Sequence, residues 1–138
     1  MKLVPDTNVS VSALLKRSSV PGQILQAWWD ARFDLLISDP LYAELADVLN
    51  RRKLRAYLEP ELSQRFLELL RDYATWVEAA QVPERALRDP KDTMVLGTAV
   101  SGRANLIVSG DQDLLALRRF QSIPILEPRA ALKMIRGR

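Results

Sequence analysis

Two strand-like stretches of the chain end on aspartates, an arrangement that could bind a metal ion. Asp6 directly follows the stretch KLVP, and Asp111 follows LIVSG, with Asp113 two positions later. In an open parallel sheet, ligands bind outside the carboxyl ends of the strands. We therefore expect these carboxylates at one edge of one sheet, where their charges repel each other unless a cation lies between them.

Two further carboxylates lie on the apolar faces of expected helices. Glu44 falls within the apolar stripe of a helix over residues 40–50, whereas Asp47 points away from that stripe. Asp92 lies near the start of a helix over residues 90–101, on the side that carries its apolar residues. A carboxylate inside a buried stripe is unusual enough to need a reason.

Each aspartate taken alone also has a purely structural interpretation. The sequence DPKD ending at Asp92 resembles a capping box, in which the acid supports the helix N-terminus. Asp111 or Asp113 alone is equally typical of a turn or a helix cap. The expected convergence of four acids from four elements on one edge is what favours a metal site over separate caps.

The chain contains no histidine and no cysteine, which narrows its chemistry. Histidine-dependent acyl transfer, imidazole or thiolate zinc sites and disulfides are excluded. Oxygen ligands alone select hard cations such as Mg²⁺ or Mn²⁺, and such ions suit phosphodiester hydrolysis. We expect Asp6, Glu44, Asp92 and Asp111 to surround such a cation, and Thr7, Asn8 and Ser109 to hold the carboxylates in position.

Positive charge is clustered, although the net charge is only +3. The segment RRKLR (51–55) holds four cations, and residues 118–138 hold six cations against the single acid Glu127. Clusters of this kind indicate a polyanionic partner, and we expect Arg51, Arg52 and Lys53 to contact it. The alternative is that both clusters are merely solvated surface.

Alternation of short apolar runs with longer helical patterns predicts an α/β fold, with a parallel sheet covered by helices on both faces. Strands are expected at 2–5, 33–37, 105–108 and 123–126, with a weaker one near Val77, and helices at 10–17, 21–31, 40–50, 60–76, 90–101 and 129–136. In SDP (38–40) and RDP (88–90) we expect aspartate at the N-cap and proline at the first helical position. The stripe from Leu62 to Trp76, together with Trp28 and Trp29, is interpreted as core.

The length of 138 residues is enough for one domain with its own core. No apolar run is long enough to span a membrane, and no signal-peptide pattern is present. The lack of cysteine fits a reducing compartment. We therefore expect a single cytoplasmic domain over residues 1–138, without membrane association.

Four segments share one family pattern in their order and spacing. They are DTNVSVSALL (6–15), SDPLYAELADVL (38–49), RDPKDTMVLGTAVSGRANLIVSGDQDLLAL (88–117) and IPILEPRAAL (123–132). Together they cover nearly the whole chain, and they resemble the PIN-domain family of metal-dependent nucleases. The most similar group is the toxin component of type II toxin–antitoxin pairs.

The resemblance implies a three-layer α/β/α fold and Mg²⁺- or Mn²⁺-dependent cleavage of single-stranded RNA. Matched by position, Asp6, Glu44, Asp92 and Asp111 correspond to the family's acidic quartet, and Asp113 corresponds to an auxiliary acid. The resemblance therefore implies that the quartet is catalytic and that Asp6, Asp92, Asp111 and Asp113 bind the metal. With RNA as the implied substrate, we expect the basic residues Arg51, Arg52 and Lys53 to bind RNA. The resemblance also implies a homodimer and a cognate antitoxin protein that blocks the site. Because histidine is missing, we expect products that end in a 5′-phosphate and a 3′-hydroxyl.

Two departures from the family pattern bear on activity. Pro5 stands where an aliphatic residue is usual and is expected to loosen or bulge the end of the first strand. Thr93 and Met94 replace more polar residues. A haloacid-dehalogenase-type phosphatase is disfavoured because Asn8 stands where it needs a second acid, and a receiver domain is disfavoured because no acidic pair precedes Asp6. The main alternative is a non-catalytic RNA- or antitoxin-binding PIN-like module.

Overall fold

A mostly parallel six-stranded sheet lies at the centre of the molecule, in the order β3-β2-β1-β4-β6-β5. The structure is a computed structural model that describes residues 1–83 and 90–137. The strands are β1 (Lys2–Pro5), β2 (Asp34–Ile37), β3 (Thr75–Trp76), β4 (Leu106–Val108), β5 (Arg119–Phe120) and β6 (Ile123–Leu126). Only β5 runs antiparallel to its neighbour among the described strands. The predicted α/β class with a central parallel sheet is confirmed, and the short edge strand β5 was not predicted.

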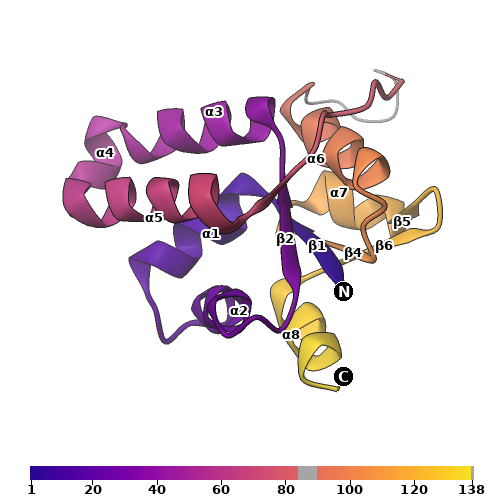
Figure 1. The fold of residues 1–138 in the computed structure, drawn as a ribbon, viewed down its shortest axis with the longest axis horizontal. Coiled ribbons are helices and arrows are strands. Elements are labelled where there is room, and N and C mark those ends of the chain that lie inside the picture. Colours follow the sequence, from indigo (N-terminus) through magenta and orange to yellow (C-terminus); the bar gives the residue numbers. More distant parts are fainter. Residues whose placement is uncertain (84–89, 138) are drawn as a thin grey trace.

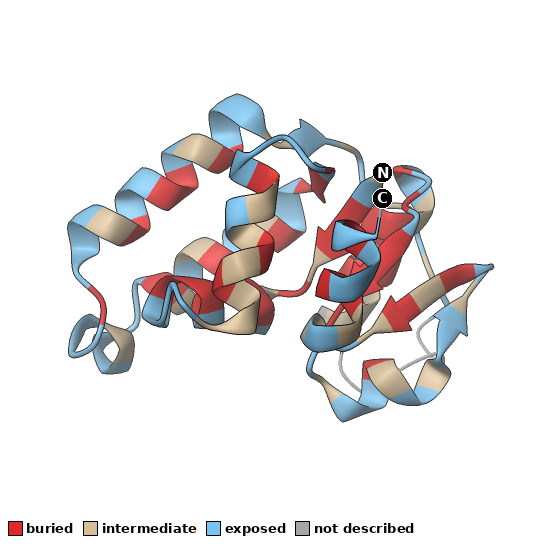
Figure 2. Ribbon diagram, turned by 90° about the horizontal axis from the view of Figure 1, so that it is seen from below, coloured by how far each residue is buried: buried red, intermediate tan, exposed pale blue. Residues whose placement is uncertain are grey.

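Helices flank the sheet on both sides. They are α1 (Thr7–Leu15), α2 (Val20–Trp29), α3 (Asp39–Leu49), α4 (Arg52–Arg55), α5 (Pro60–Tyr73), α6 (Pro90–Ser101), α7 (Gln112–Leu117) and α8 (Pro128–Arg136). Figure 1 shows α1, α2, α3 and α5 on one side of β1 and β2, and α6 on the other. Buried residues gather on the strands and on the inward helix faces (Figure 2). Within the described ranges, no helix has both the length and the apolar character needed to cross a membrane.

Several helix boundaries differ from those expected. Helix α1 begins at Thr7 because Asp6 caps it, accepting a hydrogen bond from the backbone of Val9. The N-cap of α3 is Ser38, so Asp39 is already helical, and the aspartate cap expected in SDP is wrong. The corresponding cap expected in RDP falls on positions 88 and 89, outside the described residues. The short helices α4 and α7 were not predicted, since each is too brief to show a helical period.

Three aromatic residues interpreted as core are exposed. Helix α5 ends at Tyr73, and the chain then turns into β3, which pairs with β2. Tyr73 is therefore 64% exposed and Trp76 37% exposed. Trp29 is 55% exposed while Trp28 is buried, because successive helical residues point about 100° apart and only one of the pair can face the core.

The end of β1 is regular despite Pro5. Pro5 pairs in register with Val108, and the backbone N–H of Asp6 donates to the Val108 carbonyl at 2.9 Å. Pairing between β1 and β2 already stops at Leu3, so the missing proline donor breaks no hydrogen bond there. The expected loosening or bulge is therefore wrong. As a result β1 and β4 end side by side, and both deliver an aspartate to the same edge of the sheet.

Candidate functional site

A small cleft at the carboxyl edge of the sheet contains all four acids of the expected quartet. Its volume is about 90 Å³, and its lining residues are Asp6, Thr7, Asn8, Glu44, Asp92, Val95 and Asp111. The acids come from the end of β1, the middle of α3, the start of α6 and the loop after β4. Segments distant in sequence thus place their carboxylates around one space.

Three carboxylates are close enough to bind one cation together. Asp92, Asp111 and Asp113 each offer an oxygen, and these oxygens lie within 4.8 Å of one another. Among the described residues this is the one such group, and its ligands are all oxygens, as hard divalent cations prefer. The donor set therefore fits the expected Mg²⁺ or Mn²⁺. Asp6 lines the same cleft but lies outside this group of three.

Asp6 is buried and both of its carboxylate oxygens are held. Oδ1 accepts a hydrogen bond from the Val9 backbone at 2.9 Å, and Oδ2 accepts one from the Ser109 hydroxyl. Burial raises the pKa of Asp6 above its ordinary value, and these two hydrogen bonds offset part of that rise. The nearby charges of Asp111 and Glu44 raise the pKa further. The ionised form of Asp6 is therefore disfavoured, as expected of a buried carboxylate close to other acids.

Ser109 connects the ends of the two central strands. It is fully buried, and its hydroxyl donates to Asp6 while accepting the backbone N–H of Asp111 at 2.9 Å. A serine hydroxyl has one proton and two lone pairs, so it can do both at once. Ser109 thus fixes the positions of two acids of the cleft relative to each other.

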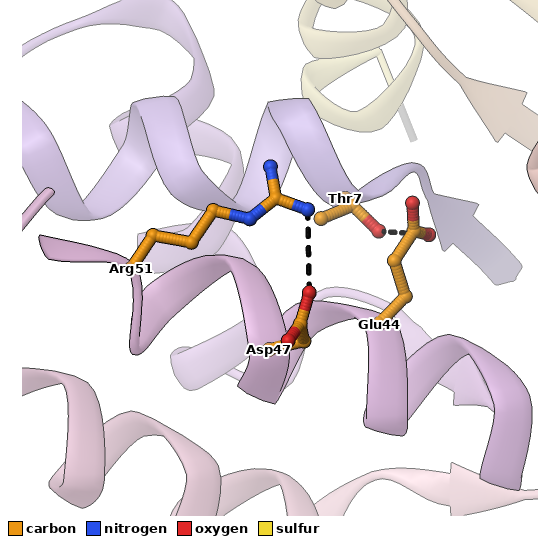
Figure 3. Close-up of polar contacts among 4 residues, drawn as sticks. All are labelled: Thr7, Glu44, Asp47 and Arg51. Atoms are coloured by element: carbon orange, nitrogen blue, oxygen red, sulfur yellow. Dashed lines mark hydrogen bonds and ion pairs between the residues drawn. The ribbon is translucent and has the colours of Figure 1, made fainter. Parts of the chain in front are cut away.

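Glu44 is held by α1 across the cleft. The hydroxyl of Thr7 donates to Glu44 Oε2 at 2.8 Å, and Figure 3 shows the Glu44 side chain reaching from α3 toward Thr7. Asp47, one turn further along α3, is exposed and pairs with Arg51 at 3.2 Å instead. The different directions expected for the two acids are confirmed. Asn8 lines the cleft and is exposed, so it is open to a ligand.

Asp6 and Asp111 each cap a helix and also line the cleft. Asp111 is the N-cap of α7, and its Oδ1 accepts the backbone N–H of Asp113 at 2.7 Å and that of Leu114 at 3.4 Å. The two interpretations weighed for Asp111 are compatible, because a carboxylate has about four lone-pair directions. The sequence could have indicated this, since a cap after a strand lies at the same sheet edge as a ligand site.

The basic segment lies outside the cleft. Arg51 is the N-cap residue of α4, and Arg52 and Lys53 form its first turn, all three exposed. Because α4 follows α3 directly, these cations lie beyond the C-terminal end of the helix that carries Glu44.

Comparison with known proteins agrees with the fold and with the family pattern. Residues 2–113 match the PIN domain family. Over 121 residues the chain is 31% identical to Uncharacterized protein MJ1680 of Methanocaldococcus jannaschii, covering 86% of this chain and 76% of that relative.

Two crystal structures have a similar fold. PAE2754 from Pyrobaculum aerophilum has a TM-score of 0.67 at 14% identity, covering 100% of this chain and 91% of its own. VapBC2 from Rickettsia felis, solved bound to a DNA fragment from their promoter, has a TM-score of 0.62 at 16% identity, covering 92% of this chain and 98% of its own. These two similarities concern the fold alone. The match over most of the sequence, together with the relative from Methanocaldococcus jannaschii, shows that the chain belongs to the PIN-domain family.

Proposed function

We propose that this chain is a metal-dependent endoribonuclease that cleaves single-stranded RNA, with residues 1–138 acting as one nuclease domain. Membership of the PIN-domain family supports a nuclease. The observation that carries the proposal is the gathering of Asp6, Glu44, Asp92 and Asp111 around one cleft in a chain without histidine. Carboxylates crowded in this way are stabilised by a bound cation rather than by one another.

Each side chain has a separate task in this proposal. Asp92, Asp111 and Asp113, together with Asp6 in the same cleft, would hold a Mg²⁺ or Mn²⁺ ion. When bound, the cation activates water and neutralises charge on the phosphate. Glu44, oriented by Thr7, is placed to accept a proton from the attacking water. Ser109 keeps the carboxylates of the two strands apart and aligned.

The decisive experiment incubates purified protein with end-labelled single-stranded RNA, with Mn²⁺, with Mg²⁺ and with excess EDTA. We expect cleavage with either metal and none with EDTA, and products that end in a 5′-phosphate and a 3′-hydroxyl. Asp92→Asn should abolish cleavage, because it removes one charge from the three-carboxylate group. Cleavage that persists in EDTA, or 2′,3′-cyclic phosphate ends, would exclude this mechanism. RNA binding with no cleavage under any of these conditions would favour the alternative of a non-catalytic module.

The proposed partner is a cognate antitoxin, with this chain as the toxin, present as a homodimer. A groove of about 370 Å³ lies between α1, α2 and α5 and is lined largely by apolar side chains, including Leu14, Trp28 and Phe66. Trp29 also lines this groove and is 55% exposed. Exposed apolar grooves are typical docking sites for an amphipathic helix. An antitoxin that bound Trp29→Ser as tightly as the wild type would contradict this placement.

A further inference from the structure

A second groove lies on the opposite side of α3 from the acidic cleft. It has a volume of about 400 Å³ and runs between α3 and α5, with α4 at one end. Its polar lining comes from three helices: Tyr42 of α3 with the C-cap residue Asn50, Arg55 of α4, and Ser63, Gln64 and Arg71 of α5. We call it the α3–α5 groove.

The lining of the α3–α5 groove carries positive charge only. Arg55 donates to Asn50 at one end, and Arg71 donates to the Tyr42 hydroxyl at 2.7 Å at the other. Among the described residues, no Asp or Glu lines the groove, although Glu68 and Asp72 act on Arg71 as neighbouring charges. Each arginine is oriented through one of its nitrogens, which leaves the remaining donors of the guanidinium available to an anion.

The space between the two arginines suits nucleotides. Gln64 is exposed there and offers both a donor and an acceptor, as reading a base edge requires. At the Arg71 end, the rings of Tyr42 and Trp76 lie with centroids 5.3 Å apart, and Trp76 is 37% exposed. Aromatic rings beside arginines are the usual means of holding single-stranded nucleic acid, because bases stack on the ring and phosphates pair with the cation.

The groove and the acidic cleft share one helix. Glu44 contacts Thr7 of α1, whereas Tyr42, two residues earlier, contacts Arg71 of α5. A helix is about 10–12 Å across, so a strand that occupied both sites would pass around α3 over a few nucleotides.

We propose that the α3–α5 groove binds a stretch of the single-stranded RNA substrate next to the segment that is cut, with Arg55 and Arg71 holding its phosphates. This inference rests on the proposed ribonuclease function. A second copy of the chain fits the groove poorly. Two-fold packing across it would bring the arginines of one copy against those of the other, and like charges repel.

Binding is tested separately from cleavage, by anisotropy of a fluorescein-labelled single-stranded RNA in EDTA. Arg55→Gln and Arg71→Gln should each raise the Kd by roughly 3- to 10-fold and reduce the slope of log K against log salt by about 0.7, the change expected for one lost phosphate contact. The matched control is Arg65→Gln, on the same helix as Arg71, where Arg65 lies 3.7 Å from Glu68 and outside the groove. This control should bind RNA as the wild type does.

With Mn²⁺ and longer RNA, the two groove variants should raise KM and leave kcat unchanged. Wild-type binding and salt slopes in both groove variants would overturn the inference while leaving the nuclease intact. A change of oligomeric state in Arg71→Gln, seen by light scattering, would also overturn it, because the groove would then be an interface between copies. If the wild type itself does not cleave RNA, the proposed function is contradicted, whatever the binding data show.

Discussion

At the scale of single residues, Asp6 carries two tasks that affect stability in opposite directions. As the cap of α1 it stabilises the fold, and as a buried charge near Glu44 and Asp111 it destabilises it. Its folded-state pKa is raised, so the stabilisation that comes from protonated Asp6 is complete below the ordinary value of 3.8 and is lost as pH rises through the raised value. At neutral pH the metal-free protein therefore bears the cost of this charge.

Asp6→Asn separates the two tasks. Asparagine retains an oxygen for the Val9 N–H and is an equally good cap. Its amide can donate to the Ser109 hydroxyl, but the Ser109 proton then loses Asp6 as its acceptor, which offsets part of the gain from removing the charge. We expect a higher melting temperature than the wild type in EDTA at pH 7, with the difference shrinking as pH falls toward 3.8. Added Mn²⁺ should stabilise the wild type by mass action and the variant much less.

A less stable Asp6→Asn protein, with a wild type that is indifferent to Mn²⁺, would show that Asp6 serves only as a cap. Cleavage should be lost in the variant, and a variant that still cleaves RNA would remove Asp6 from the catalytic set.

Much of the acidic cleft could be predicted from the sequence, because strand ends and helix periodicity fix which carboxylates share an edge. Asp6, Glu44, Asp92 and Asp111 all lie where this reasoning placed them. Hydrogen bonds among side chains could not be predicted. The contact between Thr7 and Glu44 depends on how α3 crosses α1, and no local pattern encodes a crossing angle.

At the scale of elements, a buried hydrogen bond connects α3 and α6. The Ser38 and Thr98 hydroxyl oxygens lie 2.7 Å apart, and both residues are fully buried. Thr98 donates its own proton to the Met94 carbonyl at 2.7 Å, so Ser38 must be the donor between the two hydroxyls. Glu44 lies six residues after Ser38, and Asp92 lies six residues before Thr98, so this contact sets the spacing of the helices that carry both acids.

Ser38→Ala tests whether the contact positions the acids or only stabilises the fold. We expect a stability loss of about 1–2 kcal/mol, because the buried Thr98 hydroxyl loses its donor. We also expect several-fold weaker Mn²⁺ binding by calorimetry, because Asp92 is displaced relative to the other ligands. Ser10→Ala is the control, because it removes a buried serine hydroxyl from α1 without changing the contact between Ser38 and Thr98. Equal Mn²⁺ affinity in both variants would limit Ser38 to a structural role.

The helices that were not predicted are short. Helix α4 has four residues and buries none, and α7 has six, so neither shows an apolar stripe. The exposed Trp29 and Tyr73 were assigned to the core because periodicity marks a face without showing whether another element covers it. Their rings contact each other edge-on at 5.9 Å, on a surface that a partner could cover.

At the scale of the whole molecule, acids and cations are separated along α3. The cleft is lined by four acids, whereas α4 and the residue before it present cations to solvent, where a polyanion such as the proposed RNA substrate would be attracted. Counterions released from phosphates at such a segment supply affinity that falls as salt rises. Arg51 is partly neutralised by Asp47, and Arg52 and Lys53 have no ion pair within the part of the chain that the structure describes.

Replacing Arg51, Arg52 and Lys53 together by alanine should therefore weaken RNA binding in EDTA and reduce the salt slope. If each of the three residues made one phosphate contact as an unpaired cation, its removal would reduce the salt slope by about 0.7, or by about 2 for all three. We expect less than that, because Arg51 is already paired, and we expect Arg51→Ala alone to change the slope least of the three single variants. With Mn²⁺ the triple variant should raise KM and preserve kcat, since these cations lie outside the cleft in which we propose that RNA is cut. A slope equal to that of the wild type would show that the segment is only solvated surface, and a loss of kcat at saturating RNA would place one of its cations in the chemistry.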